Sequence, residues 1–193
     1  KIAKECNVDF AVIGPEDPLA AGIADSLWEA GIKTVGPKAK GAALEASKDL
    51  SKVFMKKYGV ACAGSETFTD KEKALAYVKE KGAPIVIKAD GLAAGKGVVV
   101  ATTPEEAEKA ANDLMSGSSV GEAGKKLVIE EYLQGVEISV LAAVSVTEES
   151  SSKNTACIKA FLPSRDHKRL MDGAKGPTTG GMGAGCPLSD VTK

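Results

Sequence analysis

A glycine-rich loop between two short apolar runs constrains this chain more than any other stretch. Residues 83–101 read APIVIKADGLAAGKGVVVA, with Val and Ile on both sides of three glycines and Lys96. β-Branched residues favour strands, so this pattern predicts a hairpin whose tip is mostly backbone. Glycine lets several N–H groups approach one anion, and phosphate is the usual anion. The loop is therefore a candidate phosphate site with Lys88 and Lys96 supplying charge, and an ordinary Gly-rich turn is the competing interpretation.

The loop differs from the two familiar phosphate-binding motifs. In a P-loop, four residues separate the glycines, and Lys-Ser/Thr then opens a helix. Here three residues separate Gly91 from Gly95, and Lys96 is followed by Gly97 and a strand-like VVVA. The dinucleotide-binding fingerprint is absent for the same reason, because it too opens a helix.

Composition excludes several classes of partner. The chain has 193 residues and a formal net charge of -1, which gives no support for a nucleic-acid or membrane partner. Its 4 cysteines show no CxxC spacing, which argues against zinc and fits a reducing compartment. No apolar run reaches the length of a membrane span. The chain begins inside a predicted helix and ends without a closing element, so we expect an internal fragment of a longer protein.

The first third of the chain predicts a parallel sheet. Residues 8–13 and 32–35 are strand-like, and residues 19–30 between them have a helical pattern that ends at Gly31. This is a β-α-β unit, and in such sheets ligands bind at the carboxyl ends of strands. The turn after the first strand consists of Gly14, Pro15 and Glu16. It is a candidate ligand site or, with equal weight, a plain turn.

Helices and strands alternate through the middle of the chain. Residues 38–58 predict a helix in two pieces, the second of which opens with Lys48. An extended connector is expected over residues 60–68. Thr69 to Glu72 forms a capping-box pattern for a helix ending near residue 81, and Thr103 precedes a Pro-started helix to about residue 115.

The last third combines strands with polar segments. Strands are expected over residues 127–132, 136–146 and 156–162, with a polar hairpin tip at 147–155. A charged run, RDHKR, and a second glycine-rich segment, GPTTGGMG, then follow. Together they predict a second anion site, although a charge run is usually a solvated face. The single histidine, His167, is more often structural than catalytic.

Six segments in order resemble the ATP-grasp ligases and, among them, the phosphoribosylamine–glycine ligase family. The segments are VIGPEDPL, GPKAKGAALEASK, GAPIVIKADGLAAGKGVVVA, VIEEYLQGVEISV, DHKR and GPTTGGMGA. The resemblance implies an α/β and α+β chain: an ATP-grasp fold preceded by part of a parallel-sheet N-terminal domain. The implied domains are residues 1–46 (end of the N-terminal domain), residues 47–67 with 134–193 (central ATP-grasp domain) and residues 68–133 (lid).

The resemblance also implies a reaction. Members of this family join glycine to 5-phosphoribosylamine in the cytoplasm, giving glycinamide ribonucleotide for purine biosynthesis while ATP becomes ADP and phosphate. A carboxylate is a poor electrophile, so a glycyl phosphate forms first and the amine then displaces phosphate. Such chemistry needs clamped phosphates and exclusion of water.

Site residues are implied by the same segments. For ATP they are Lys48, Lys88, Gly91, Gly95, Lys96, Gly97, Glu130, Glu131, Leu133 and Glu137. For the other substrates they are Gly14, Pro15, Glu16, Gly180, Gly181, Met182 and Gly183. The catalytic set is Lys88, Asp166, His167, Lys168 and Arg169. The family's Mg²⁺ carboxylates lie beyond this stretch, so we expect no metal ligand here and no turnover by this stretch alone.

Two positions depart from the family pattern. Thr178 stands where the family has Asn, and Gly185 stands where Tyr is common. Two alternatives therefore remain: another ATP-grasp ligase or carboxylase, and a nucleotide-binding relative that has lost catalysis.

Overall fold

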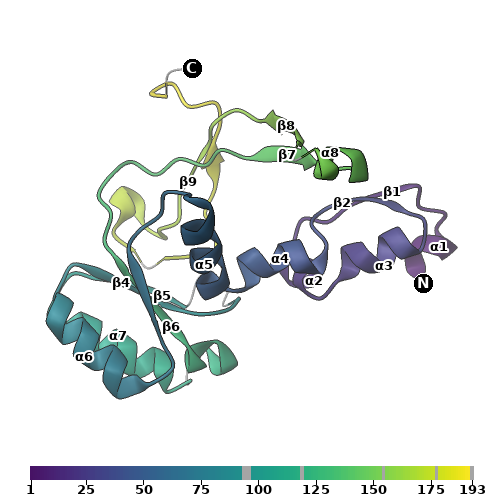
Figure 1. Cartoon of the computed structure of the whole chain (residues 1–193). Helices are drawn as coiled ribbons and strands as arrows, with labels where there is room; N and C mark the ends of the chain where they lie inside the picture. Colours follow the sequence, from purple (N-terminus) through teal and green to yellow (C-terminus); the bar gives the residue numbers. More distant parts are fainter. Residues whose placement is uncertain (93–96, 118–119, 154, 177, 192–193) are drawn as a thin grey trace. The chain divides into compact units, whose positions relative to one another are not determined.

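The computed structural model describes residues 1–92, 97–117, 120–153, 155–176 and 178–191 (Figure 1). Gly95 and Lys96, both predicted to bind ATP, lie outside the described residues. The chain divides into two compact units, Lys1–Leu133 and Gln134–Lys193. Among the described residues, no helix is both long and apolar enough to cross a membrane.

The predicted parallel strand pair lies near the start of the first unit. Strands β1 (Phe10–Val12) and β2 (Lys33–Val35) are parallel, with Ala11 opposite Thr34, which confirms the β-α-β prediction. Helix α1 (Ile2–Glu5) precedes them and α4 (Ala39–Ala46) follows. A small core of Leu19, Ala24 and Ala42 joins the helices of this segment.

The single helix predicted over residues 19–30 is wrong. The segment forms two helices, α2 (Glu16–Ala20) and α3 (Ile23–Glu29). Gly22 separates them with a φ of 87°, a left-handed conformation that glycine adopts without the penalty of a Cβ. Gly31 (φ 81°) follows α3, close to the predicted stop.

Helix α5 (Lys48–Tyr58) begins where the sequence predicts a break. Ser47 has extended backbone angles, and its Oγ accepts a hydrogen bond of 3.1 Å from the N–H of Leu50. Gly59 ends the helix in the left-handed conformation. Lys48 is consequently the first residue of a well-capped helix, and its position is fixed by local backbone structure.

The centre of the first unit is a four-stranded antiparallel sheet in the order β3-β6-β4-β5. Its strands are β3 (Ser65–Phe68), β4 (Ile85–Ala89), β5 (Val98–Ala101) and β6 (Leu127–Glu131). Strands β4 and β5 form the predicted hairpin, with Lys88 opposite Val98. The predicted connector at residues 60–68 is wrong over its last four residues, which form the edge strand β3.

The two faces of this sheet differ. Helices α6 (Lys71–Lys81) and α7 (Pro104–Met115) lie side by side against one face (Figure 1). Alternate residues such as Ile85, Ile87 and Ile129 pack there against helix alanines. Successive strand residues point to opposite faces, so Lys88 and Glu130 lie on the face that α6 and α7 leave uncovered.

The helix starts agree with the sequence in one case of two. Thr103 caps α7 as predicted, with its Oγ1 accepting from the N–H of Glu106 at 3.2 Å. At α6 the cap is Asp70 and not Thr69, because the Asp70 carboxylate accepts from the N–H of Lys73 at 3.0 Å. A short 3-10 helix, η1 (Gly121–Lys125), leads into β6.

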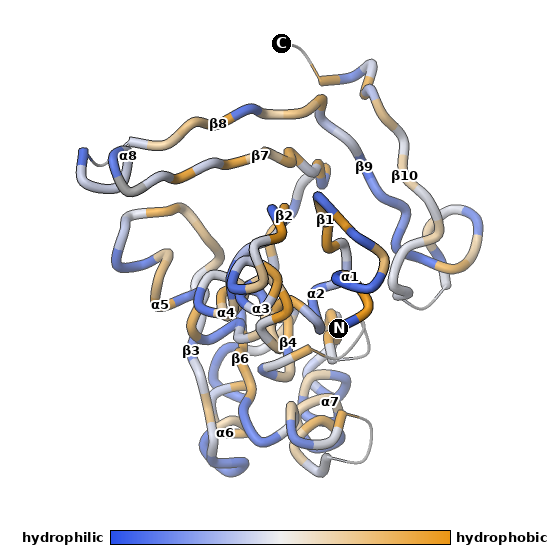
Figure 2. Tube along the Cα trace, turned by 90° about the vertical axis from the view of Figure 1, so that its right-hand side faces the viewer, coloured by the Kyte–Doolittle hydropathy of each residue, from blue (hydrophilic) through white to orange (hydrophobic). Residues whose placement is uncertain are grey.

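The second unit is built from two antiparallel strand pairs. Strand β7 (Ala142–Ser145) pairs with β8 (Cys157–Ala160), and β9 (Arg165–Asp166) pairs with β10 (Ala184–Gly185). Of the long strand predicted over residues 136–146, only β7 is a regular strand. The apolar residues of β7 appear in orange in Figure 2. The predicted tip contains α8 (Glu148–Ser152), capped by Thr147, and η2 (Asp172–Ala174) precedes the second glycine-rich segment.

Candidate functional site

One buried carboxylate organises the open face of the sheet. Glu130 is 6% exposed, and its Oε2 lies 3.0 Å from the Nζ of Lys88 and 3.3 Å from the Nζ of Lys52. In the ladder Glu130 is opposite Val86, so Lys88 is its diagonal neighbour on the same face. Two ammonium groups on one carboxylate leave a net positive charge beside the strand that leads into the Gly-rich loop.

Helix α5 presents three lysines at four-residue spacing toward backbone carbonyls. Lys48 donates to the carbonyl of Gly91 at 2.7 Å, Lys52 to that of Ala63 at 3.0 Å and Lys56 to that of Ser65 at 3.0 Å. Residues four apart lie on one side of a helix, which explains why all three reach the same neighbourhood. Lys48 was among the residues predicted to bind ATP, whereas Lys52 was not.

Lys48 lies at the start of the Gly-rich loop. Burial lowers the pKa of its ammonium group below the usual value, while the charge of Asp90 acts in the opposite direction. Lys88 also lowers this pKa, so the two predicted phosphate-binding lysines are near enough to repel each other. A phosphate group between them would relieve that repulsion, so the pair is a candidate anion site.

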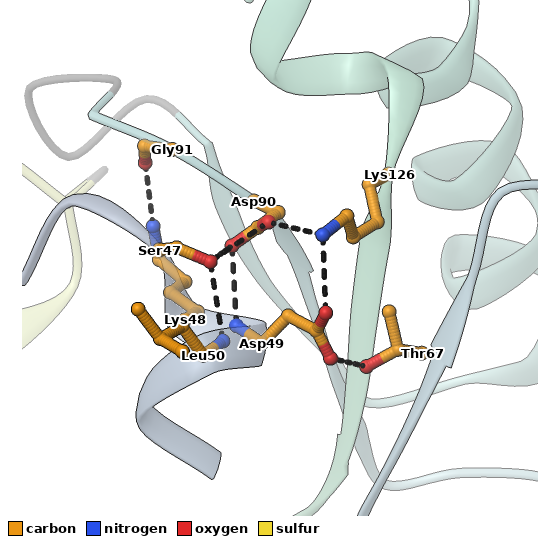
Figure 3. Close-up of polar contacts among 8 residues, drawn as sticks. All are labelled: Ser47, Lys48, Asp49, Leu50, Thr67, Asp90, Gly91 and Lys126. Carbon is orange, nitrogen blue, oxygen red and sulfur yellow. Dashed lines mark hydrogen bonds and ion pairs between the residues drawn. The ribbon is translucent and has the colours of Figure 1, made fainter. Parts of the chain in front are cut away.

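A polar network ties α5 to the loop (Figure 3). The Asp90 carboxylate accepts hydrogen bonds of 3.2 Å from the Ser47 hydroxyl and from the N–H of Asp49. The Nζ of Lys126 lies 3.1 Å from Asp90 and 3.0 Å from Asp49, and the Thr67 hydroxyl donates to Asp49 at 2.8 Å. The network thus joins the first turn of α5, strand β3 and the residues that flank β4 and β6.

Charges within this network perturb each other. The hydrogen bonds from Thr67 and Lys126 hold the pKa of Asp49 below its usual value. The hydrogen bonds to Asp49 and Asp90 raise the pKa of Lys126. Sequence reasoning missed these residues because their contacts span 18 to 77 positions of the chain.

The described ends of the loop are held by backbone contacts. The N–H of Ala89 donates to the carbonyl of Gly97 at 2.7 Å, and the N–H of Asp90 donates to that of Lys126 at 2.9 Å. Gly91 has a φ of 126°, and a Cβ added there would lie 3.1 Å from the Cβ of Ala123. A side chain at Gly91 is therefore disfavoured by both conformation and space.

Strand β6 continues into the segment predicted to contact adenine. Glu131 pairs with Gly64 through its backbone N–H at 3.0 Å, and its carboxylate accepts from the N–H of Gly64 at 2.7 Å. Leu133 is exposed. At the other predicted ligand turn, Pro15 occupies the N-cap position of α2, Glu16 is its first residue, and a Cβ added at Gly14 would meet no atom within 4 Å.

In the second unit the structure brings the two predicted polar segments together. The N–H of His167 donates to the carbonyl of Gly183 at 2.8 Å, and that of Met182 donates to the carbonyl of His167 at 2.8 Å. Arg169 forms an isolated bridge with Thr178, one of the two positions that depart from the family pattern. The other, Gly185, lies in β10 opposite Arg165. Gly180 and Gly181 lie between these paired positions.

Several charged side chains of the second unit form ion pairs next to these backbone hydrogen bonds. The Lys168 ammonium donates to the Glu137 carboxylate, which raises the pKa of Lys168, and Asp166 lies 3.8 Å from the same ammonium. Arg165 donates to the Glu137 carbonyl at 3.1 Å and to Asp190 at 2.9 Å. Glu137, predicted to contact ribose, is thus paired with Lys168 in this structure.

Among the residues that the structure describes, no three His, Cys, Asp or Glu side chains converge to hold a metal ion.

The antiparallel sheet with its Gly-rich hairpin, covered on one face by α6 and α7, has the architecture of the ATP-grasp fold. Biotin carboxylase from Campylobacter jejuni has this fold, with a TM-score of 0.66 over 91% of this chain and 38% of that chain. The identity is 18%, so this likeness concerns the fold alone. The predicted fold is confirmed.

The chain belongs to the phosphoribosylglycinamide synthetase family. Residues 1–45 match the N domain of that family and residues 46–193 match its ATP-grasp (A) domain. The boundary between the two matches lies at the end of α4, next to the break at Ser47. The resemblance stated from the six sequence segments is confirmed.

Two relatives illustrate the relationship. The phosphoribosylamine–glycine ligase of Listeria monocytogenes serotype 4b is 48% identical over 191 residues, which is 99% of this chain and 43% of that protein. The crystal structure of the Thermotoga maritima phosphoribosylamine–glycine ligase is 37% identical, with a TM-score of 0.66 over 81% of this chain and 38% of that chain. This chain thus spans less than half the length of these relatives.

Proposed function

We propose that the natural protein carrying this sequence is an ATP-dependent ligase that joins glycine to 5-phosphoribosylamine. The products are glycinamide ribonucleotide, ADP and phosphate, and the pathway is purine biosynthesis in the cytoplasm. The observation that carries the proposal is the placement of Lys48 and Lys88 at the root of a glycine-rich loop in a chain whose whole length matches this family.

The proposed chemistry begins with the glycine carboxylate. Its oxygen attacks the γ-phosphorus of ATP, and the bond from that phosphorus to the β,γ-bridging oxygen breaks, giving glycyl phosphate and ADP. The amine of 5-phosphoribosylamine then attacks the glycyl carbon and expels phosphate. The lysines favour the first step because they stabilise negative charge on the phosphates in a site that excludes water.

Roles for the individual residues follow from this scheme. Lys48, Lys88 and the loop from Gly91 to Gly97 bind the phosphates, and the segment from Glu130 to Leu133 borders the adenine. Glu137 would accept hydrogen bonds from ribose hydroxyls. The remaining residues, namely Gly14, Pro15, Glu16, Asp166, His167, Lys168, Arg169, Gly180, Gly181, Met182 and Gly183, face glycine and 5-phosphoribosylamine. The lid at residues 68–133 closes over the nucleotide.

The proposed reaction uses magnesium. Phosphoryl transfer from ATP needs a divalent cation to neutralise the phosphates. The carboxylates that would hold it are expected outside this chain.

The test is ligand-induced thermal stabilisation of the natural full-length protein. We expect ATP with Mg²⁺ to raise the melting temperature, because a ligand that binds the native state stabilises it, and glycine to raise it further. Lys88→Ala should abolish the ATP shift. The matched control is Lys79→Ala on α6, where an exposed ion pair with Glu108 at 3.7 Å is removed and the shift should remain.

Other outcomes separate the alternatives. An ATP shift with a further shift from bicarbonate, and none from glycine, would favour a carboxylase. An ATP shift with neither would favour a nucleotide-binding relative without this catalysis. No ATP shift in the wild type would contradict the nucleotide site itself.

A further inference from the structure

The side chain of Asp90 contacts the start of helix α5 on both sides of Lys48. Its side chain is 9% exposed, and it accepts from the Ser47 hydroxyl and from the N–H of Asp49, the residues on either side of Lys48. In the chain it immediately precedes Gly91, whose carbonyl accepts from Lys48 at 2.7 Å. One carboxylate therefore fixes both neighbours of Lys48 and the start of the loop (Figure 3).

We propose that Asp90 is a positioning residue that holds Lys48 at the root of the Gly-rich loop, in place for a nucleotide phosphate. The proposal rests on the nucleotide site of the proposed function. Groups that are already ordered before a ligand binds lose less entropy on binding, and Asp90 holds the backbone around Lys48 while the next residue, Gly91, accepts from the Lys48 ammonium.

Lys126 secures Asp90 from the opposite side. Its ammonium bridges Asp90 and Asp49 at 3.1 and 3.0 Å, so Asp90 is held by a cation that does not itself contact Lys48 in the described structure. Asp90 acts on Lys48 in two ways, by holding its position and by its negative charge. Because Lys126 anchors Asp90 but is itself positive, replacing Lys126 separates these two effects.

The charge effect has a definite sign. Burial lowers the pKa of Lys48, Lys88 lowers it too, and Asp90, Glu45 and Glu130 raise it. Removing the charge of Asp90 therefore lowers this pKa further, and Lys48 loses its proton at a lower pH. Phosphate binding that depends on the ammonium form should then decline at a lower pH as well.

The experiment uses calorimetry to measure the affinity of the natural full-length protein for ATP, in the presence of Mg²⁺ and over a range from neutral to alkaline pH. Asp90→Asn keeps the size of the side chain and removes its charge. We expect affinity at neutral pH to fall roughly tenfold, which corresponds to about 1.4 kcal/mol. The alkaline decline of affinity should also move to lower pH.

Lys126→Met is the second variant and Lys125→Met is its control. Lys126→Met loosens the same anchor but removes a cation, so affinity should fall without any shift of the alkaline decline to lower pH. Lys125 is 73% exposed in its side chain and pairs with Glu122 at the surface, so Lys125→Met should bind ATP like the wild type.

Every result of these measurements either supports or overturns the proposal for Asp90. Unchanged affinity in Asp90→Asn overturns the proposal, and so does weaker affinity with an unshifted pH profile, since a purely structural role predicts that. If Asp90→Asn does not fold, Lys126→Met with wild-type affinity overturns it alone. A wild type that binds no ATP contradicts the proposed function and this inference together, whereas a binding wild type with unaffected variants contradicts this inference only.

Discussion

Glu130 is a buried carboxylate that pairs with two lysines of the first unit. It is 6% exposed, and its carboxylate is shared by Lys52 and Lys88, which come from a helix and a strand. Breaking a buried ion pair by removing one partner leaves an unpaired charge in a poorly solvated place, which costs more than the pair itself contributes.

We predict that Glu130→Gln destabilises the protein by about 3 kcal/mol, because Lys52, itself 8% exposed, loses its carboxylate partner. The control is its neighbour Glu131→Gln, an exposed position where the amide oxygen can still accept from Gly64. Urea unfolding followed by circular dichroism measures both. Equal midpoints for the two variants would contradict the buried role of Glu130.

Candidate site residues could be proposed from the sequence only where their chain neighbours or the family resemblance marked them. Lys88 adjoins a glycine-rich loop, so local sequence made it a candidate, whereas Lys48 became a candidate only through the family resemblance. Asp90, Asp49 and Lys126 carry no such signal, because their partners lie 18 to 77 positions away. Only the assembled sheet brings these side chains together.

At the scale of elements, α7 shows a fully local helix signal. Thr103 caps it, Pro104 occupies the first turn, and Ala107, Ala110, Ala111 and Leu114 form the buried stripe. The Glu106 carboxylate accepts from the N–H and hydroxyl of Thr102, both at 2.8 Å, which closes the helix start.

We predict that Thr103→Ala costs about 1 kcal/mol of stability, whereas Thr103→Ser, which keeps the cap, costs little. At α6, Asp70→Ala should cost a similar amount and Thr69→Ala almost nothing, because Asp70 holds the cap there. Chemical denaturation measures all four variants. A large effect of Thr69→Ala would contradict the observed cap.

Elements were predicted less well where long-range contacts decide them. The hairpin β4–β5 and the break at Ser47 follow from local residues, and both are confirmed. Strand β3 has no nearby partner, since it pairs with β6 about sixty positions later, so Ser65 opposite Glu130 could not be foreseen. The split at Gly22 was missed because a single glycine is also tolerated inside a helix.

At the scale of the whole molecule, the Asp49–Lys126 pair links stability to pH. The pKa of Asp49 is lowered in the folded protein, so its contribution is present above its ordinary pKa and is lost as pH falls toward the folded value. The pKa of Lys126 is raised, so its contribution is present below its ordinary pKa and is lost as pH rises through the folded value.

We predict that Asp49→Asn flattens the acid side of the curve of unfolding free energy against pH, and that Lys126→Met flattens the alkaline side. Asp113→Asn, at an exposed position of α7, is the control and should leave both sides unchanged. Unfolding in urea over a series of buffers gives the curves. Wild-type slopes in both variants would show that the pair does not couple folding to protonation.

Strand order in the four-stranded sheet also bears on how the protein is made. Strand β6 lies between β3 and β4, both of which precede it in the chain. While the ribosome synthesises the protein, β4 can pair with β5 early, but its other edge and all of β3 wait until Leu127–Glu131 has emerged from the exit tunnel. Open strand edges invite pairing with other chains. The nascent chain therefore carries open edges on β3 and β4 between the synthesis of the Gly-rich hairpin and the arrival of β6.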